Sequence, residues 1–267
     1  MTDHRGRGGR RGGADGRSLA PPPDTVTLAG RRPALEAIAA GRAARLVVAE
    51  EAHGRIVETI RDAARRVGIP IESATTRELD AMRLGEHQGV VAFARLPPTL
   101  DDRAVARRPF RADALVVVLD GVTDPQNLGA CARAAEAAGA DLLVTRVHRA
   151  AALTAAAVRA SAGALLHLEV ARVTNLSRAI DLLKDRRFTV VGLDAAGTAT
   201  IHDEPPRRPL ALVVGSEGAG MSRLVRESCD LLVRIPMLGR VGSLNAASAL
   251  AVALFGYAGR AAAEGDE

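Results

Sequence analysis

A run at 114–120, ALVVVLD, in which three consecutive valines stand among six apolar residues, is the feature that most constrains how this chain can fold. Because the run lacks polar alternation, it suits a strand that is buried on both faces of a parallel sheet. Five more strand signals follow, with helical stretches between most of them, at 141–147, 166–170, 188–194, 210–215 and 231–236. This alternation predicts an α/β fold with an open, mostly parallel sheet and helices on both of its faces.

The chain before this sheet divides into three parts. Residues 1–23 are rich in Arg and Gly and have almost no apolar side chains, which predicts a disordered arm. Residues 24–96 alternate shorter helix and strand signals, which predicts a small α/β domain. Three prolines and a charge cluster interrupt the pattern in 97–112, as is typical of a linker. The sheet domain then spans 113–267.

Arginine supplies nearly all of the positive charge of the chain. Lys184 is the single lysine and lies in a charged helix end, so neither a P-loop nor a Schiff-base lysine is expected. The arm contributes +3 of the formal net charge of +5. Arginine side chains suit bidentate contacts to phosphate, which favours RNA as a partner. The alternative is that the arm only improves solubility and that the arginine bias reflects genome composition.

Several classes of protein are disfavoured by what the sequence lacks. Cys131 and Cys229 lie far apart and outside any zinc-binding spacing, which argues against a disulfide framework or a structural zinc. No uncharged apolar run reaches membrane-spanning length, and the first residues do not resemble a signal peptide. We therefore expect a cytoplasmic protein that binds neither a membrane nor a metal.

Ligands of open parallel sheets bind at the carboxyl ends of the strands, so three strand-end loops are the places to search. In the first loop, Asp124 is expected to cap a helix, Pro125 suits its first position, and the amide of Asn127 falls in its first turn. Arg133 follows about 9 Å further along that helix. The alternative for Arg133 is a surface ion pair with Glu136.

The second loop, VVGSEGAGMS, contains three glycines and one carboxylate. Gly215, Gly218 and Gly220 let the backbone pass close to a ligand, and Glu217 lies among them. The order of the glycines differs from the dinucleotide fingerprint, which argues against a nicotinamide dehydrogenase. A flexible turn with a solvated Glu217 is the alternative.

The third loop, IPMLGRVGSLNAAS, precedes a long apolar helix. Ser243 is expected to be the N-cap, and free N–H groups of the first turn beside Asn245 could bind a ligand. The helix is apolar on nearly every side through Phe255, so we expect it to be buried centrally or in a subunit interface.

In this order on one sheet, the segments DPQNLGACARAAEAAG, VVGSEGAGMS and IPMLGRVGSLNAAS resemble the three motifs of the SpoU-type RNA ribose 2′-O-methyltransferases, which belong to the knotted SPOUT superfamily. The segments GEHQGVVAFARL and ARVTNLSRAI and the small first domain look like the branch that methylates a guanosine of 23S rRNA. The resemblance covers essentially residues 24–260.

This resemblance implies a C-terminal trefoil knot, a substrate-binding domain like ribosomal protein L30e at 24–96, and a homodimer formed through the knotted domain. It implies S-adenosylmethionine as the cofactor, RNA as the partner and no metal. A tRNA guanosine as the target, and a non-catalytic RNA-binding protein on the same fold, are the alternatives.

The family's functional residues carry over by matching position. The catalytic set is Asn127, Arg133, Glu217, Ser243 and Asn245, and the cofactor-binding set is Gly215, Ile235, Met237 and Leu244. In the family the matching arginine is proposed as the general base, but an arginine side chain keeps its proton at neutral pH. Two roles for Arg133 therefore stay open, a base in a tuned site or a clamp for an RNA phosphate.

Two further points test the resemblance. Ala247 stands where the family often has a second serine, and Ser248 follows one step later, which turns the hydroxyl by about 100° around the helix. A cytosine C5-methyltransferase is a competing interpretation, because Cys131 could serve as its thiol nucleophile. A cysteine flanked by alanines in a helix is more often a small buried residue.

Overall fold

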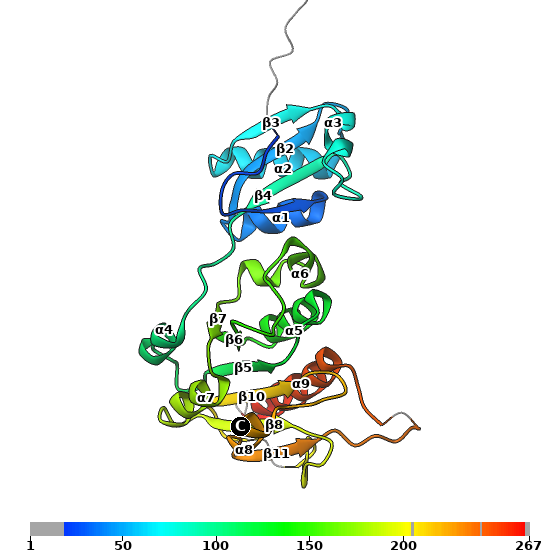
Figure 1. Cartoon of the computed structure of the whole chain (residues 1–267). Coiled ribbons are helices and arrows are strands. Elements are labelled where there is room, and N and C mark those ends of the chain that lie inside the picture. The colour runs from blue at the N-terminus through cyan, green and yellow to red at the C-terminus, as the bar shows by residue number, and fades with distance from the viewer. Residues whose placement is uncertain (1–18, 204–205, 241, 265–267) are drawn as a thin grey trace, which may run out of the picture.

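The computed structural model describes residues 19–203, 206–240 and 242–264, with side chains up to residue 257. Figure 1 shows a small domain followed by a larger sheet domain. The predicted arm lies outside the described residues over its first 18 positions.

The first domain is a four-stranded sheet with the order β1-β4-β2-β3. Strand β2 pairs parallel with β3 and antiparallel with β4, and β1 pairs antiparallel with β4. The predicted α/β domain is therefore present, and β1 is an additional strand that the sequence pattern does not indicate. Its elements are β1 (Val26–Ala29), α1 (Arg31–Ala39), β2 (Ala43–Ala49), α2 (Arg55–Arg66), β3 (Ile71–Ala74), α3 (Thr76–Ala81) and β4 (Val90–Ala94).

The predicted linker contains a helix that its prolines and charges concealed. Helix α4 (Asp102–Arg107) is capped by Asp101, whose carboxylate accepts from the N–H of Ala104. The segment after it is fixed to the sheet domain, because Arg108 donates two hydrogen bonds to Glu169 and Phe110 packs edge-on against Phe188.

The sheet domain has seven parallel strands in the order β7-β6-β5-β10-β8-β11-β9. This confirms the open parallel sheet. The strands are β5 (Leu115–Asp120), β6 (Leu142–Arg146), β7 (Val170–Val173), β8 (Thr189–Leu193), β9 (Ala199–Thr200), β10 (Leu210–Gly215) and β11 (Leu231–Arg234). The helices are α5 (Pro125–Ala137), α6 (Ala155–Ala160), the 3₁₀ turn η1 (Ala164–Leu166), α7 (Leu176–Lys184), α8 (Arg223–Glu227) and α9 (Ala246–Glu264).

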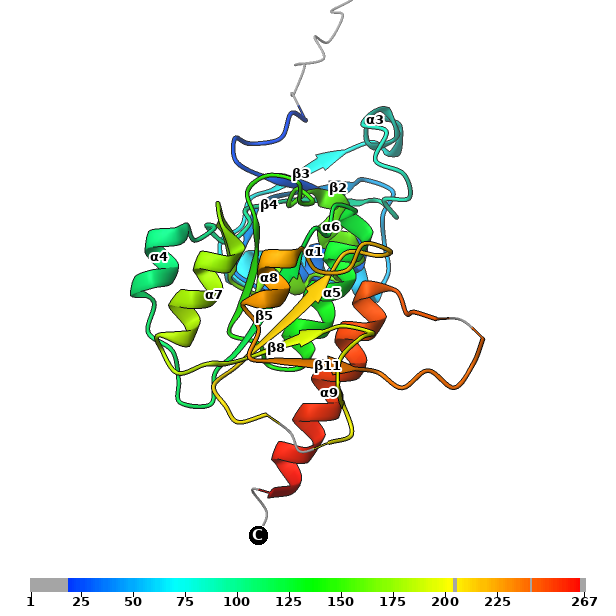
Figure 2. The ribbon, with the colours of Figure 1, turned by 60° about the horizontal axis from the view of Figure 1, so that its bottom comes forward.

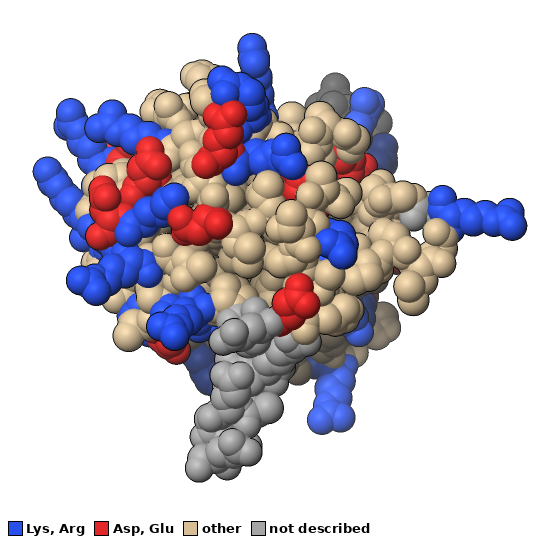
Figure 3. Space-filling model, turned by 90° about the horizontal axis from the view of Figure 1, so that it is seen from below, with Lys and Arg blue, Asp and Glu red and all other residues tan. Residues whose placement is uncertain are grey.

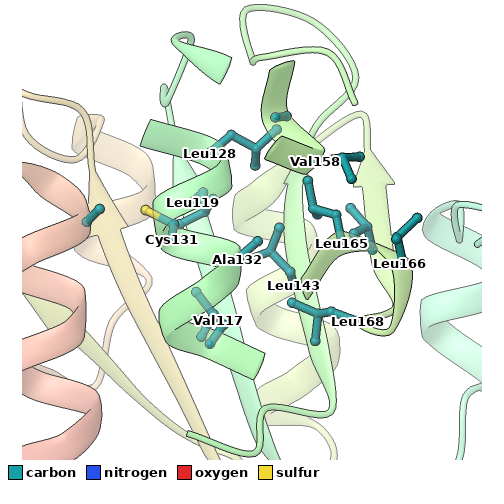
Figure 4. Close-up of a cluster of buried hydrophobic side chains, with 14 of the residues drawn as sticks. Val117, Leu119, Leu128, Cys131, Ala132, Leu143, Val158, Leu165, Leu166 and Leu168 are labelled. Carbon is teal, nitrogen blue, oxygen red and sulfur yellow. The ribbon is translucent and has the colours of Figure 1, made fainter. Parts of the chain in front are cut away.

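Helices cover both faces of this sheet, as predicted. On one face α5 packs against α6 and α9, and on the other α7 packs against α4 and α8. Alternate residues of β5 serve the two faces, because Val117 and Leu119 join one hydrophobic cluster and Val116 and Val118 join the other. Figure 4 shows the first cluster, with Leu128 and Ala132 of α5 among its buried residues.

Strand β10 lies between β5 and β8, both of which precede it in the chain. The chain therefore re-enters its own sheet before α9 returns to pack on α5 and β10.

Helix α9 is buried on one side and exposed on the other, so the expected central burial is met only in part within one chain, and burial in a subunit interface stays a prediction. Leu250, Ala253 and Leu254 are buried, whereas Val252 is 41% and Phe255 is 51% exposed. No helix in the described ranges is long and apolar enough to cross a membrane.

Candidate active site

Strand-end loops form one cleft at the carboxyl edge of the sheet. It encloses about 760 Å³, within the range of about 300–1,000 Å³ that is usual for small-molecule sites. Its wall is made by the loop after β10, by the segment between β11 and α9, which Figure 2 shows reaching away from the body of the domain, and by the end of β8. The predicted residues among its lining are Gly215, Glu217, Ile235, Met237, Ser243, Leu244 and Asn245.

Three polar side chains from the three predicted motifs meet at this cleft. The amide of Asn127 donates to Glu217 Oε1 at 3.2 Å. The amide of Asn245 donates to Asn127 Oδ1 at 2.9 Å and also to Glu217 Oε1. Residues separated by up to 118 positions are thus joined in one hydrogen-bonded cluster. We call Asn127, Glu217 and Asn245 the polar cluster.

The start of α5 places Asn127 as the sequence predicts. Asp124 is the N-cap and accepts from the N–H of Gln126 at 3.1 Å, and Pro125 occupies the first helical position. Asn127 is the third residue of the helix, so its side chain lies at the end that faces the cleft.

The glycines of the second motif are required by the chain itself. A Cβ atom on Gly215 would lie 2.0 Å from the carbonyl carbon of Gly220 and 2.2 Å from the nitrogen of Met221. Gly218 and Gly220 adopt φ values of +76° and +67°, which side chains disfavour. Ser216 and Gly220 exchange backbone hydrogen bonds, so the loop is a tight turn rather than a flexible one.

The expectation that Ser243 caps the last helix is wrong. Helix α9 begins at Ala246, and the Asn245 side-chain oxygen accepts from the N–H of Ala247 at 2.9 Å and of Ser248 at 3.3 Å. Asparagine is as good an N-cap as serine, and the sequence alone did not separate the two. Asn245 therefore has two tasks, since its oxygen fixes the helix and its amide nitrogen joins the polar cluster.

Arg133 lies apart from the polar cluster. It is exposed on α5 and is not among the residues that line the cleft. In the part of the chain described, its side chain makes no hydrogen bond or ion pair, and the alternative pairing with Glu136 is not formed.

The loop after β8 was missed by the sequence reasoning. Leu193, Asp194, Ala195 and Ala196 line the cleft, and Asp194 forms an ion pair with Arg226 at 2.8 Å. The rule that ligands bind at strand ends would have included this loop, because β8 is a neighbour of β10. Among the described residues, no group of three His, Cys, Asp or Glu side chains is placed to hold a metal ion.

Comparisons with known proteins agree with this arrangement. The model of the SpoU rRNA methylase family matches residues 114–255, and the model for RNA 2′-O ribose methyltransferase substrate binding matches residues 27–100. YacO of Bacillus subtilis, assigned by name to the TrmH family of tRNA/rRNA methyltransferases, is 43% identical over 72% of this chain and 78% of its own length. The chain belongs to the SpoU rRNA methylase family.

Solved structures of SpoU relatives share its fold. The SpoU methyltransferase AviRb from Streptomyces viridochromogenes, in complex with the cofactor AdoMet, is 29% identical, with a TM-score of 0.75 over 90% of this chain and 92% of its own. A structure described as showing 2-OH methylation of C/U34 on tRNA is 27% identical, with a TM-score of 0.51. The match covers 57% of this chain and 99% of that chain.

The thiol of Cys131 is unsuited to be the nucleophile of a cytosine C5-methyltransferase. The side chain is fully buried, and burial, followed by the negative charge of Glu217, raises its pKa to about 12. The thiol is therefore protonated at neutral pH, and only the thiolate is a strong nucleophile.

We expect native protein to resist alkylation at Cys131 by iodoacetamide at pH 8, and a Cys131→Ala variant to keep its methyltransferase activity. Mass spectrometry of tryptic peptides and a methyl-transfer assay measure the two outcomes, with urea-unfolded protein as the positive control for alkylation. Loss of turnover in step with alkylation of Cys131 in the native protein would favour the thiol mechanism.

Proposed function

We propose that this SpoU family member uses S-adenosylmethionine to methylate the ribose 2′-hydroxyl of a guanosine in 23S rRNA. The observation that carries the proposal is the polar cluster at the edge of a cleft of cofactor size. A non-catalytic RNA-binding protein would gain nothing from joining Asn127, Glu217 and Asn245 there.

The cleft fits the cofactor in its chemistry. Val214, Ile235, Met237 and Leu244 offer apolar surface to a flat heterocycle. The backbone N–H of Leu244 has no acceptor among the described residues, so it is available to a ring nitrogen. Bound S-adenosylmethionine supplies a methyl group on a positively charged sulfur, which a sugar oxygen can attack. Glu217 and Asp194 are the carboxylates in the wall, and because Asp194 is paired with Arg226, the Glu217 charge is the one that complements a cation.

The residues of the polar cluster hold each other in place for this reaction. Glu217 accepts from both amides, so neither asparagine nor the carboxylate needs to reorganise when the substrate arrives. The hydroxyl proton must leave as its oxygen attacks, and Glu217 is the member of the cluster that can accept a proton. Positioning of the sugar supplies much of the remaining acceleration.

The first domain favours ribosomal RNA over tRNA. The substrate-binding model matches residues 27–100, so this chain carries a whole domain in addition to its sheet domain. The neighbour described for C/U34 of tRNA aligns over nearly all of its own length but only 57% of this chain. A ribosomal target also places the protein in the cytoplasm.

The direct test is to map ribose methylation in rRNA and tRNA from cells that lack the protein. We expect one guanosine of 23S rRNA to lose its 2′-O-methyl group and to regain it with the wild-type gene. An Asn245→Ala gene should not restore it, and purified Asn245→Ala protein should be slower by about 100-fold, because the cluster loses an amide and α9 loses its cap. A missing tRNA methyl group would instead favour the tRNA alternative, and unchanged methylation would contradict the proposal.

Arg133 is assigned the role of a clamp for an RNA phosphate, because it is exposed, lies outside the cleft lining, and has no partner among the described residues. We expect Arg133→Lys to keep substantial activity and Arg133→Ala to raise KM for RNA by about tenfold. Steady-state kinetics at two salt concentrations measure both. Full loss of kcat in Arg133→Lys, with RNA binding intact, would contradict a simple clamp and favour the base.

The exposed side of α9 is proposed as the homodimer contact. Val252 and Phe255 form an apolar face on the helix that follows the third motif. Figure 3 shows that the face seen from below is uncharged over a broad central area, with Lys and Arg mostly at its periphery.

We expect the wild-type protein to be a dimer by light scattering at micromolar concentration, and Phe255→Glu to be a monomer because a charge would be buried in the contact. Leu224→Glu is the matched control, since Leu224 is 57% exposed on α8, on the opposite face of the sheet, and this variant should stay dimeric. A monomeric wild-type protein would contradict the proposed contact.

A further inference from the structure

We propose that Asp120 is a positioning residue whose buried carboxylate fixes the 216–222 loop and so shapes the cleft. The inference rests on the proposed cofactor and assigns a function to a residue outside both predicted sets. Asp120 is the last residue of β5, and it is only 4% exposed.

The carboxylate joins two strand ends to the loop. Asp120 Oδ2 accepts from the backbone N–H of Ser222 at 2.7 Å, and Oδ1 forms an ion pair with Arg146 Nη2 at 3.0 Å. The same nitrogen of Arg146 donates to Ser222 Oγ at 3.2 Å. The three residues form a closed triangle between β5, β6 and the residue that precedes α8.

A charge at this position is not explained by packing alone. The other residues of β5 are apolar and buried, and an apolar residue would continue that core at lower cost. Burial of a carboxylate costs free energy unless it is paired and hydrogen-bonded. Both oxygens of Asp120 make their contacts within the triangle, one with Ser222 and one with Arg146. What the carboxylate achieves is a fixed position for the Ser222 backbone.

The position of Ser222 is transmitted to the cleft through its neighbours. Gly220 and Met221 precede it, both line the cleft, and both lie against the Cα atom of Gly215. On the other side, a Cβ atom on Gly121 would lie 3.5 Å from Ser216, so the residue after Asp120 also lies near this loop. Release of Ser222 would therefore loosen the wall that holds the cofactor.

Substitutions at Ser222 separate the two bonds of the triangle. Ser222→Ala removes the hydroxyl but keeps the N–H, so we expect affinity for S-adenosylmethionine to stay within about twofold of the wild type. Ser222→Pro removes the N–H, and the Ser222 φ of −62° already suits proline. We expect this variant to bind S-adenosylmethionine about tenfold more weakly by calorimetry, because the carboxylate loses its partner.

Substitutions at Asp120 provide the second arm of the test. Asp120→Ala should weaken S-adenosylmethionine binding by about tenfold or more, and Asp120→Asn, which keeps an oxygen for the Ser222 N–H, should recover part of that loss. KM for S-adenosylmethionine should rise more than kcat falls. Ser161→Ala is the stability control, since it removes a buried hydroxyl that bonds within the α6–η1 segment and does not line the cleft.

The outcomes distinguish this inference from the proposed function. Binding by Ser222→Pro equal to the wild type, or a loss in Asp120→Ala no greater than in a Ser161→Ala protein of the same thermal stability, would overturn the positioning role. A wild-type protein without affinity for S-adenosylmethionine would instead overturn the proposed cofactor, on which this inference rests.

Discussion

The insertion of β10 between β5 and β8 is the constraint on which the rest of the site depends. It pairs Gly215 with Asp120 at the same edge, where the loop after β10 turns back through hydrogen bonds between Ser216 and Gly220. The turn is possible only because Gly215 allows backbone atoms of Gly220 and Met221 to approach where a Cβ atom would stand. The ligand cleft is thus a product of the strand order, and the glycines allow this close backbone contact before they serve any ligand.

The polar cluster is held in place by the backbone around this cleft. Each of its members is held by a structural feature that also terminates or begins an element: the capped start of α5 holds Asn127, the tight turn holds Glu217, and the N-cap of α9 holds Asn245. Because backbone geometry fixes the three side chains, little free energy is needed to order them when a substrate binds.

Much of this was accessible from the sequence, for physical reasons that differ between elements. An apolar run such as that of β5 predicts burial directly, and Asp124 and Pro125 predict the start of a helix. The cap of α9 was misplaced because Ser243 and Asn245 have equal propensity, and only the path of the preceding loop decides between them. Helix α4 was hidden because it is short and stabilised by tertiary contacts such as that of Arg108 with Glu169. No local pattern could reveal that Asp120 meets Ser222, since 102 residues separate them.

The linker is attached to the sheet domain, and this attachment bears on how the proposed RNA substrate would be positioned. Only a few residues after β4 are unsupported before Leu100 bridges to Ala171. On the other side, Glu36 of α1 lies against Gly163 and 3.8 Å from His167. Both connections are short, so the structure ties the position of the first domain to that of the cleft. For the RNA substrate proposed above, this would fix the separation between the part that the first domain contacts and the ribose at the cleft.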